Sequence, residues 1–326
     1  LHLSIRRQRQ MCIRDSTVAA ASLTGLPVTQ NYFDLPVDAL GILRTDHPHY
    51  YRGKLEGETE IQFVDRIVGN LENLIIAEDP STIAAFIAEP ITGASGVIVP
   101  PDGYYEGIQN VLDKYGIMFW ADEVITGFGR TGSDFGCTTM EIKSPDMMTF
   151  AKQLSSAYMP ISASAIRRDV YEAMIDQSAS AGAFGHGYTY SGHPVACAVA
   201  LRVLEIYDRD EIFDRASTTG KYLQEQLSQF SSHPLVGEVR GSGLLAALEL
   251  VPNKELNHQF KDGKVGGVAQ KMAQDNGLLI RTVAGSSIGI CPPLIITNNQ
   301  IDELIDKLGD ALDKTFQYCQ TYNLLT

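Results

Sequence analysis

The sequence is poor in the features that mark secreted, membrane-spanning and nucleic-acid-binding proteins. Its 326 residues hold five cysteines, scattered without a CxxC pair, which excludes a dense disulfide framework and favours free thiols in a reducing compartment. No apolar run approaches the roughly 18 to 20 residues that span a bilayer. Basic residues are outnumbered 26 to 39, and the formal charge of −13 disfavours binding to phosphate backbones or anionic membranes. These absences predict a cytoplasmic protein.

Positive charge is concentrated in the first sixteen residues, LHLSIRRQRQMCIRDS, which differ in this way from the rest of the chain. An organelle-targeting peptide and a nucleic-acid-binding arm would both be rich in arginine. We favour a third interpretation, in which residues 1–15 are a translated sequencing-adapter read and carry no evolved function. The natural N-terminus is then expected to be missing.

Other familiar site patterns are missing or out of context. There is no GxSxG, so a hydrolase triad lacks support. Gly127, Gly129 and Gly132 spell GxGxxG, but the preceding strand ends too early and SDFGCTTM is a poor helix start, which disfavours a dinucleotide-binding loop. The two histidines at residues 47–49 lack a third metal ligand at a suitable spacing, so we interpret them as structural.

The N-terminal two-thirds alternates short apolar runs with helical segments. Alternation of this kind predicts a parallel sheet covered by helices. Strands are expected at residues 83–88, 117–121, 147–151 and 161–166, and helices at 103–115 and 168–175.

The remainder of the chain has the pattern of a smaller α+β domain. A long amphipathic helix over residues 194–207 is expected to link the two parts. After it, we expect a helix near 211–230, a strand pair around 236–250, a helix near 265–276, short strands at 278–281 and 288–291, and a terminal helix from Asn298. We therefore divide the chain into a partial large domain, 16–200, and a small C-terminal domain, 201–326.

A carboxylate and a lysine each follow a predicted buried strand: Asp122 after IMFWA and Lys152 after MMTFA. Ligands bind at that edge of open α/β sheets. A lysine there is expected to be partly desolvated, which favours the neutral amine that forms a Schiff base with pyridoxal phosphate. A fixed carboxylate would keep the pyridine nitrogen of that cofactor protonated, and Val124 could pack against the ring. Spacing alone leaves open a surface lysine and a turn-capping aspartate.

Six ordered motifs resemble the class III aminotransferases of fold type I, in particular the omega-amino acid and amine:pyruvate group. They are AEPITGASGVIVPPDGYY, WADEVITGFGRTG, FAKQLSSAYMPISA, HGYTYSGHPVACAVA, VRGSGLLAALEL and RTVAGSSIGICPPLII. The resemblance runs from about Ser16 to the last helix. It implies an α/β fold with a mainly parallel, seven-stranded type of sheet, of which this chain holds a part, and it implies pyridoxal phosphate as the cofactor.

The resemblance also implies roles for individual residues. Lys152 matches the lysine that holds the cofactor and moves the substrate proton, Asp122 matches the partner of the pyridine nitrogen, and Val124 matches the residue beneath the ring. Thr189 is similar to a threonine that reaches across a dimer interface to the partner's cofactor phosphate, which implies a homodimer with shared sites.

Two further matches have open alternatives. Glu89 matches a glutamate near the cofactor, or it shapes its own loop through a salt bridge. Arg281 matches an arginine that binds the carboxylate of the acceptor, or it pairs with a surface acid.

The implied function is transfer of an amino group from an amine or omega-amino acid to a keto acid, with pyruvate favoured, by a ping-pong mechanism. The alternatives are a 4-aminobutyrate/2-oxoglutarate aminotransferase, a pyridoxal phosphate-dependent aminomutase or decarboxylase, and an inactive fragment. Ile13-Arg14-Asp15 stand where the family has Tyr-His-Gly, and the phosphate-binding turn is expected to be absent, so the chain as written is expected to be inactive. Gln153 and Ala157 stand where many relatives carry glycine.

Overall fold

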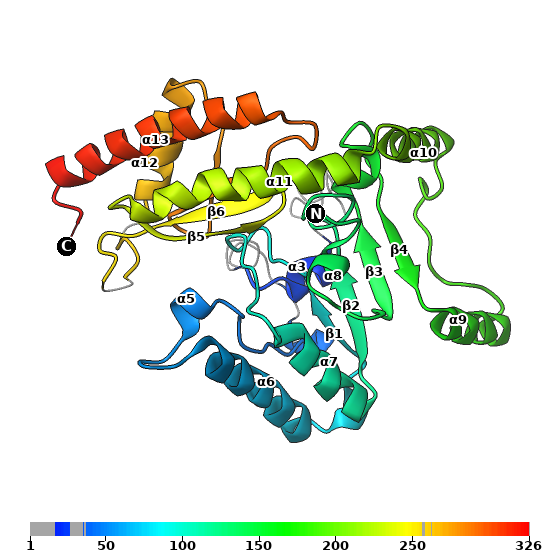
Figure 1. The fold of residues 1–326 in the computed structure, drawn as a ribbon. Coiled ribbons are helices and arrows are strands. Elements are labelled where there is room, and N and C mark those ends of the chain that lie inside the picture. The colour runs from blue at the N-terminus through cyan, green and yellow to red at the C-terminus, as the bar shows by residue number, and fades with distance from the viewer. Residues whose placement is uncertain (1–16, 27–34, 36, 256–257, 262, 326) are drawn as a thin grey trace.

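A computed structural model describes residues 17–26, 35, 37–255, 258–261 and 263–325 of the chain (Figure 1). The interpretation of residues 1–15, including the departure at 13–15, lies outside the described residues. The helices are α3 (Val18–Leu23), α5 (Tyr50–Gly53), α6 (Glu60–Ala77), α7 (Tyr104–Tyr115), α8 (Gly136–Thr139), α9 (Arg168–Ala181), α10 (Pro194–Arg209), α11 (Ile212–Ser228), α12 (Val265–Asp275) and α13 (Asn298–Thr321).

The first sheet consists of β1 (Ala85–Ala88), β2 (Met118–Asp122), β3 (Met147–Phe150) and β4 (Ala163–Ile166), in that order. β1, β2 and β3 are parallel, which confirms the predicted, mainly parallel α/β architecture. β4 instead runs antiparallel to β3. The connection between β3 and β4 contains only the short 3-10 helix η3 (Lys152–Ser155), which is too small to act as the crossover helix that a parallel pair requires.

Helices α6 and α7 cover this sheet and share a core with it. α6 begins with a capping box, because the Thr59 hydroxyl accepts from the Gln62 N–H while the Gln62 side chain accepts from the Thr59 N–H. The two helices approach closely at Gly107, where a β-carbon would lie 2.9 Å from the Val68 side chain. Phe63, Ile108 and other buried residues of α6 and α7 pack with residues of β2 into one apolar cluster.

The second sheet is antiparallel and has the strand order β5-β6-β8-β7. Its strands are β5 (Val236–Ser242), β6 (Leu245–Leu250), β7 (Arg281–Val283) and β8 (Ser287–Ile290). Helices α11, α12 and α13 lie along it (Figure 1) and bury a second, larger apolar cluster. The strand predicted at 278–281 begins three residues too early. The Leu278 N–H bonds back to the Ala273 carbonyl at the end of α12, and Leu279 is exposed.

Helix α10 contacts both η3 and α11. Val203 and Tyr207 on this helix belong to the second cluster, and the helix also contacts η3 beside the first sheet. The division into two domains, with its boundary at residue 200, stays a prediction. Within the described ranges, no helix is long and apolar enough to cross a bilayer.

Candidate active site

Three adjacent parallel strands end in residues that the sequence had singled out. Glu89 follows β1, Asp122 is the last residue of β2, and Lys152 lies two residues beyond β3. The register pairs Asp122 with Thr149, so the aspartate and the lysine belong to neighbouring strand ends. The fold therefore brings Glu89, Asp122 and Lys152 to one edge of the sheet, which is where open α/β sheets bind ligands.

The Asp122 carboxylate is fixed at the strand end by the backbone that follows it. Its Oδ1 accepts from the Val124 N–H at 3.1 Å, and Val124 itself is 3% exposed. Thr149 on β3 holds the same region, because its carbonyl accepts from the Glu123 N–H at 2.9 Å and its hydroxyl accepts from the indole of Trp120 at 2.6 Å. The half-buried carboxylate therefore has a defined position beside a buried apolar side chain.

Glu123 anchors the turn that follows Asp122. The sequence analysis did not identify this residue. Its side chain is fully buried, and its carboxylate accepts from the Gly136 N–H at 2.9 Å, the Cys137 N–H at 2.7 Å and the Thr126 hydroxyl. Burial and the nearby Glu123 charge raise the pKa of the Cys137 thiol. A buried carboxylate with three donors fixes the path of the chain directly after Asp122.

Lys152 opens the 3-10 helix η3, and its backbone has a φ of +42°. The prediction that burial partly desolvates this lysine is wrong for the single protomer, because the side chain is exposed. The error has a physical cause: an apolar strand buries its own residues, but Lys152 lies beyond the strand and the loop that follows, 156–158, is also exposed.

Glu89 is hydrogen-bonded within its own loop. Its Oε2 accepts from the Gly93 N–H at 2.9 Å, and its main-chain carbonyl accepts from the buried Tyr105 hydroxyl at 2.6 Å. These bonds leave a role beside the cofactor untested. The position at the end of β1 agrees with either interpretation.

Thr189 and Arg281 are not joined to this edge by any hydrogen bond or ion pair given for the described residues. Thr189 lies in the exposed segment 182–192 between α9 and α10. Arg281 is the exposed first residue of β7, opposite Gly289 of β8 in the second sheet. Their predicted roles toward the cofactor phosphate and the acceptor carboxylate stay predictions.

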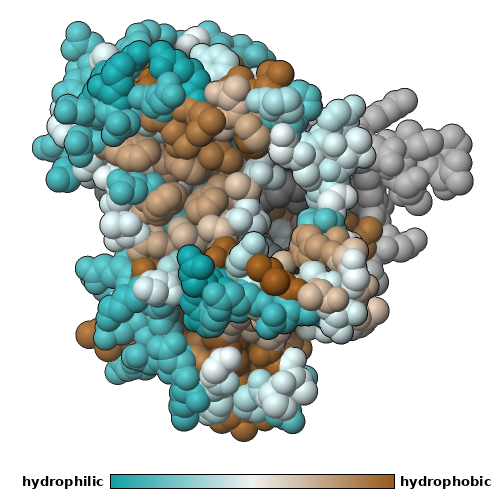
Figure 2. All heavy atoms as spheres, turned by 90° about the vertical axis from the view of Figure 1, so that its right-hand side faces the viewer, coloured by the Kyte–Doolittle hydropathy of each residue, from teal (hydrophilic) through white to brown (hydrophobic). Residues whose placement is uncertain are grey.

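The side of the molecule that carries α9, β4 and α10 exposes many large apolar side chains. Figure 2 views this side and shows apolar residues gathered in a band bordered by hydrophilic ones. The exposed fractions are 51% for Tyr171, 47% for Ile175, 55% for Phe184, 63% for Tyr188, 80% for Tyr190, 54% for Val195 and 63% for Leu201. Such a concentration is typical of a surface that another protein chain covers.

The second and third glycines of the GxGxxG pattern lie where this loop approaches α11 and the turn between β5 and β6. They lie in a run of turns, and Gly129 and Gly132 have φ values of +86° and +89°. A β-carbon at Gly129 would lie 2.7 Å from the Phe213 ring, whereas one at Gly132 would lie at an ordinary contact distance of 3.6 Å from Ser217. The adjacent Arg130 is buried and donates to the carbonyls of Leu244, at 3.0 Å, and of Pro292.

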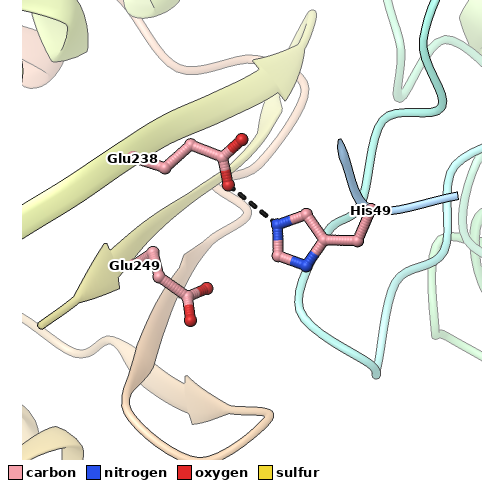
Figure 3. Close-up of side chains that lie close together, drawn as sticks. All are labelled: His49, Glu238 and Glu249. Atoms are coloured by element: carbon pink, nitrogen blue, oxygen red, sulfur yellow. Dashed lines mark hydrogen bonds and ion pairs between the residues drawn. The ribbon is translucent and has the colours of Figure 1, made fainter. Parts of the chain in front are cut away.

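His49 gains two acidic neighbours from the second sheet, Glu238 of β5 and Glu249 of β6 (Figure 3). Its Nε2 lies 2.9 Å from Glu238 Oε2, and the three side chains could in principle hold a cation. Both carboxylates are already paired: Arg240 lies 2.7 Å from Glu238 and 2.8 Å from Glu249, and Arg52 lies 2.7 Å from Glu249. A metal ion would have to displace two guanidinium groups, so the interpretation of His49 as structural is favoured.

A cavity of about 270 Å³ lies beside this ion-pair cluster of His49, Arg52, Glu238, Arg240 and Glu249. Asp122 and Lys152 do not line it. The cluster joins the segment before α6 to the second sheet, and Arg240 also donates to the carbonyls of Gly96 and Val97. We interpret it as a structural connection.

Comparison with known proteins gives a family and close relatives. The model of the family described as aminotransferase class-III matches residues 36–312. The chain is 49% identical over 308 residues to a probable gamma-aminobutyrate transaminase 3, mitochondrial, from Oryza sativa subsp. indica, covering 94% of this chain and 60% of that protein. It is likewise 49% identical over 308 residues to a gamma aminobutyrate transaminase 1, mitochondrial, from Solanum lycopersicum, covering 94% and 59%.

Solved structures match the fold at similar identity. The omega transaminase from Pseudomonas jessenii in complex with PMP superposes with a TM-score of 0.90 at 47% identity, covering 94% of this chain and 67% of that chain. A transaminase with L-ala matches with a TM-score of 0.90 at 46% identity, covering 95% and 72%. The chain spans about 60% of the length of the curated relatives it matches.

Proposed function

The chain belongs to the class III aminotransferases, and on that premise we propose that it moves an amino group from an amine or omega-amino acid to a keto acid with pyridoxal phosphate. The observation that carries the proposal is the meeting of Asp122 and Lys152 at neighbouring ends of parallel strands. The residues at this edge fit the cofactor. Lys152 offers a primary amine that can reach a ligand, Asp122 offers a fixed carboxylate, and Val124 offers buried apolar surface.

When bound, the cofactor supplies an electron sink that withdraws electrons from the substrate carbon. Asp122 would be the acidic partner of the pyridine nitrogen. Lys152 Nζ would hold the cofactor, and its amine could then serve as the general base and general acid that moves the substrate proton. Arg281 binds the carboxylate of the incoming keto acid with two parallel hydrogen bonds.

A homodimer is part of the proposal. The exposed segment 182–192 carries Thr189 and is flanked by the apolar side chains of α9 and α10. In the dimer, the Thr189 hydroxyl of one protomer would donate its hydrogen to the cofactor phosphate in the other protomer's site. Each site then uses residues from both chains, and dimer formation is required for cofactor binding.

The substrates follow from the relatives and the chemistry of Arg281. Two plant relatives are named gamma-aminobutyrate transaminases, which supports an omega-amino acid such as 4-aminobutyrate as the donor. The acceptor is pyruvate, with 2-oxoglutarate as the alternative. Product analysis separates them, since pyruvate yields alanine and 2-oxoglutarate yields glutamate.

A reducing compartment such as the cytoplasm is the proposed location. Within the described residues Cys137, Cys197, Cys291 and Cys319 are free thiols. A mitochondrial location, as in the names of the two plant relatives, is the alternative.

The test is cofactor fixation at Lys152. The purified chain is incubated with pyridoxal phosphate, reduced with borohydride and mapped by mass spectrometry, beside Lys152→Ala and beside Lys143→Ala, which removes another exposed lysine. The proposal expects the fixed cofactor on Lys152 in the wild-type chain and in Lys143→Ala, and its loss in Lys152→Ala. Fixation that is absent from Lys152, or that survives in Lys152→Ala at the same level, would contradict the proposal.

A further inference from the structure

The turn that begins at Lys152 contains unusual backbone. Lys152, Ser156 and Ala157 have φ values of +42°, +48° and +62°, although none is a glycine. Left-handed backbone is unfavourable for residues with a β-carbon and persists only where neighbouring contacts hold it in place. The contacts that hold this turn therefore also determine the direction of the Lys152 side chain.

Hydrogen bonds within the turn fix part of its conformation. The Ser156 N–H donates to the Gln153 carbonyl at 3.1 Å, and the Ala157 N–H donates to the Lys152 carbonyl at 3.2 Å. The buried Ser155 hydroxyl donates to the Met159 carbonyl at 2.7 Å. These bonds close the turn but do not fix it relative to the rest of the protein.

Tyr207 of α10 forms a hydrogen bond to the turn from outside it. Its hydroxyl lies 2.9 Å from the Gln153 main-chain carbonyl and 3.3 Å from the Gln153 side-chain oxygen. A tyrosine hydroxyl has a single proton to donate, and the shorter distance assigns it to the carbonyl. That carbonyl has two lone pairs and can accept from Ser156 and Tyr207 together.

Tyr207 is well placed for this task because its own position is fixed. The side chain is 8% exposed, and its ring lies 5.5 Å from the ring of Phe213. Burial raises the pKa of Tyr207, so the hydroxyl keeps its proton at neutral pH. The tyrosine belongs to the second core, so its hydroxyl connects that core to the Lys152 turn.

We propose that Tyr207 is a positioning residue for Lys152, acting through the main-chain carbonyl of Gln153. The inference rests on the proposed function, in which Lys152 binds the cofactor. Without the hydroxyl, the strained turn is expected to sample other backbone conformations, and the Lys152 amine then spends less time in the direction that the cofactor requires.

The test compares three variants. Tyr207→Phe removes the hydroxyl and keeps the ring. Gln153→Ala removes the side-chain oxygen and keeps the carbonyl, so the proposal expects wild-type behaviour. Tyr222→Phe is the matched control, because it removes a hydroxyl on α11 that bonds Asp302 of α13 at 2.6 Å, away from the turn.

The first readout is the concentration of pyridoxal phosphate that half-saturates borohydride fixation on Lys152. Tyr207→Phe should raise it about fivefold, which corresponds to one hydrogen bond of about 1 kcal/mol. Gln153→Ala and Tyr222→Phe should stay within about twofold. Equal half-saturation in Tyr207→Phe and wild type would overturn the positioning role while leaving the proposed function intact.

The second readout needs no cofactor. Hydrogen exchange at the Ser156 and Ala157 amides, and trace acetylation of Lys152 relative to Lys143, are measured by mass spectrometry. Tyr207→Phe should change the exchange rate of these two amides, and the ratio of Lys152 to Lys143 acetylation, by about threefold or more. The thermal midpoints of the control variants should equal that of the wild type. If wild type fixes no cofactor on Lys152, the proposed function fails, and this readout still decides whether Tyr207 holds the turn. Unchanged exchange and acetylation would refute the hold.

Discussion

Replacing Glu123 should destabilise the protein by an amount that follows from its contacts. The carboxylate is fully buried and accepts from the Gly136 and Cys137 N–H groups and from the Thr126 hydroxyl. A buried N–H left without a partner costs about 1–3 kcal/mol. Glu123→Ala leaves two such N–H groups and should cost about 2–6 kcal/mol, and Glu123→Gln, which keeps one acceptor oxygen, should cost about 1–3 kcal/mol.

Urea denaturation measures this loss. The midpoint should fall while the slope with urea stays constant, because the surface exposed on unfolding is unchanged. Glu141→Ala removes an exposed carboxylate close by in the sequence and should change the free energy of unfolding by less than about 0.5 kcal/mol. A loss below about 1 kcal/mol in Glu123→Ala would refute the view that these hydrogen bonds anchor the turn after Asp122.

Three further predictions concern the ion-pair cluster and the proposed dimer. Arg240→Met leaves Glu238 and Glu249 without a shared guanidinium and should cost about 3–5 kcal/mol in urea denaturation; a loss under about 1 kcal/mol would contradict it. Burial raises the pKa of Glu249, but Arg240 and the Arg52 hydrogen bond outweigh it and hold the pKa below the ordinary 4.5. The unfolded chain then binds a proton at Glu249 more readily than the folded chain does. The stability that Glu249 contributes is therefore complete above about pH 4.5 and is lost as the pH falls through the folded pKa. In thermal melts, Glu249→Gln should lose less stability at acid pH than the wild type, and equal losses would argue against this prediction. Thr189→Ala and Lys152→Ala, each expected to fix no cofactor alone, should together fix about a quarter of the wild-type amount if sites are shared in a dimer, and no recovery would count against sharing.

Local pattern was enough to predict the strand ends that form the candidate site. The apolar run before Asp122 predicts a strand at 117–121, and β2 is found at Met118–Asp122. Apolar residues between turn-forming neighbours give this signal without knowledge of the remaining fold. The placement of Asp122 and Lys152 at one edge of the sheet then follows from the parallel arrangement of β2 and β3.

Contacts between distant residues could not be predicted in the same way. Tyr207 and Gln153 are 54 residues apart, and His49 and Glu238 are 189 apart, so no local period relates them. The exposure of Lys152 also escaped prediction, because it depends on which other segments cover the end of β3. Hydrophobic pattern reports the burial of a strand, and not that of the residue that follows it.

The exposure of Lys152 and of the segment around Thr189 leads to a last prediction. The proposed function requires a reactive amine on Lys152, and this side chain is exposed to water in the single protomer. A second copy that covers the segment 182–192 and the apolar face of α10 would also remove water near the strand ends, since α10 contacts η3. The extent of Lys152 acylation should therefore change by about threefold or more when the protein concentration is raised through the range in which dimers form. The extent of Lys143 acylation should stay constant. Mass spectrometry across a dilution series, with Leu201→Glu as a variant that places a charge on the apolar face, measures both. A Lys152 signal that is independent of concentration in the wild-type chain and equal in Leu201→Glu would show that the site does not depend on a second copy.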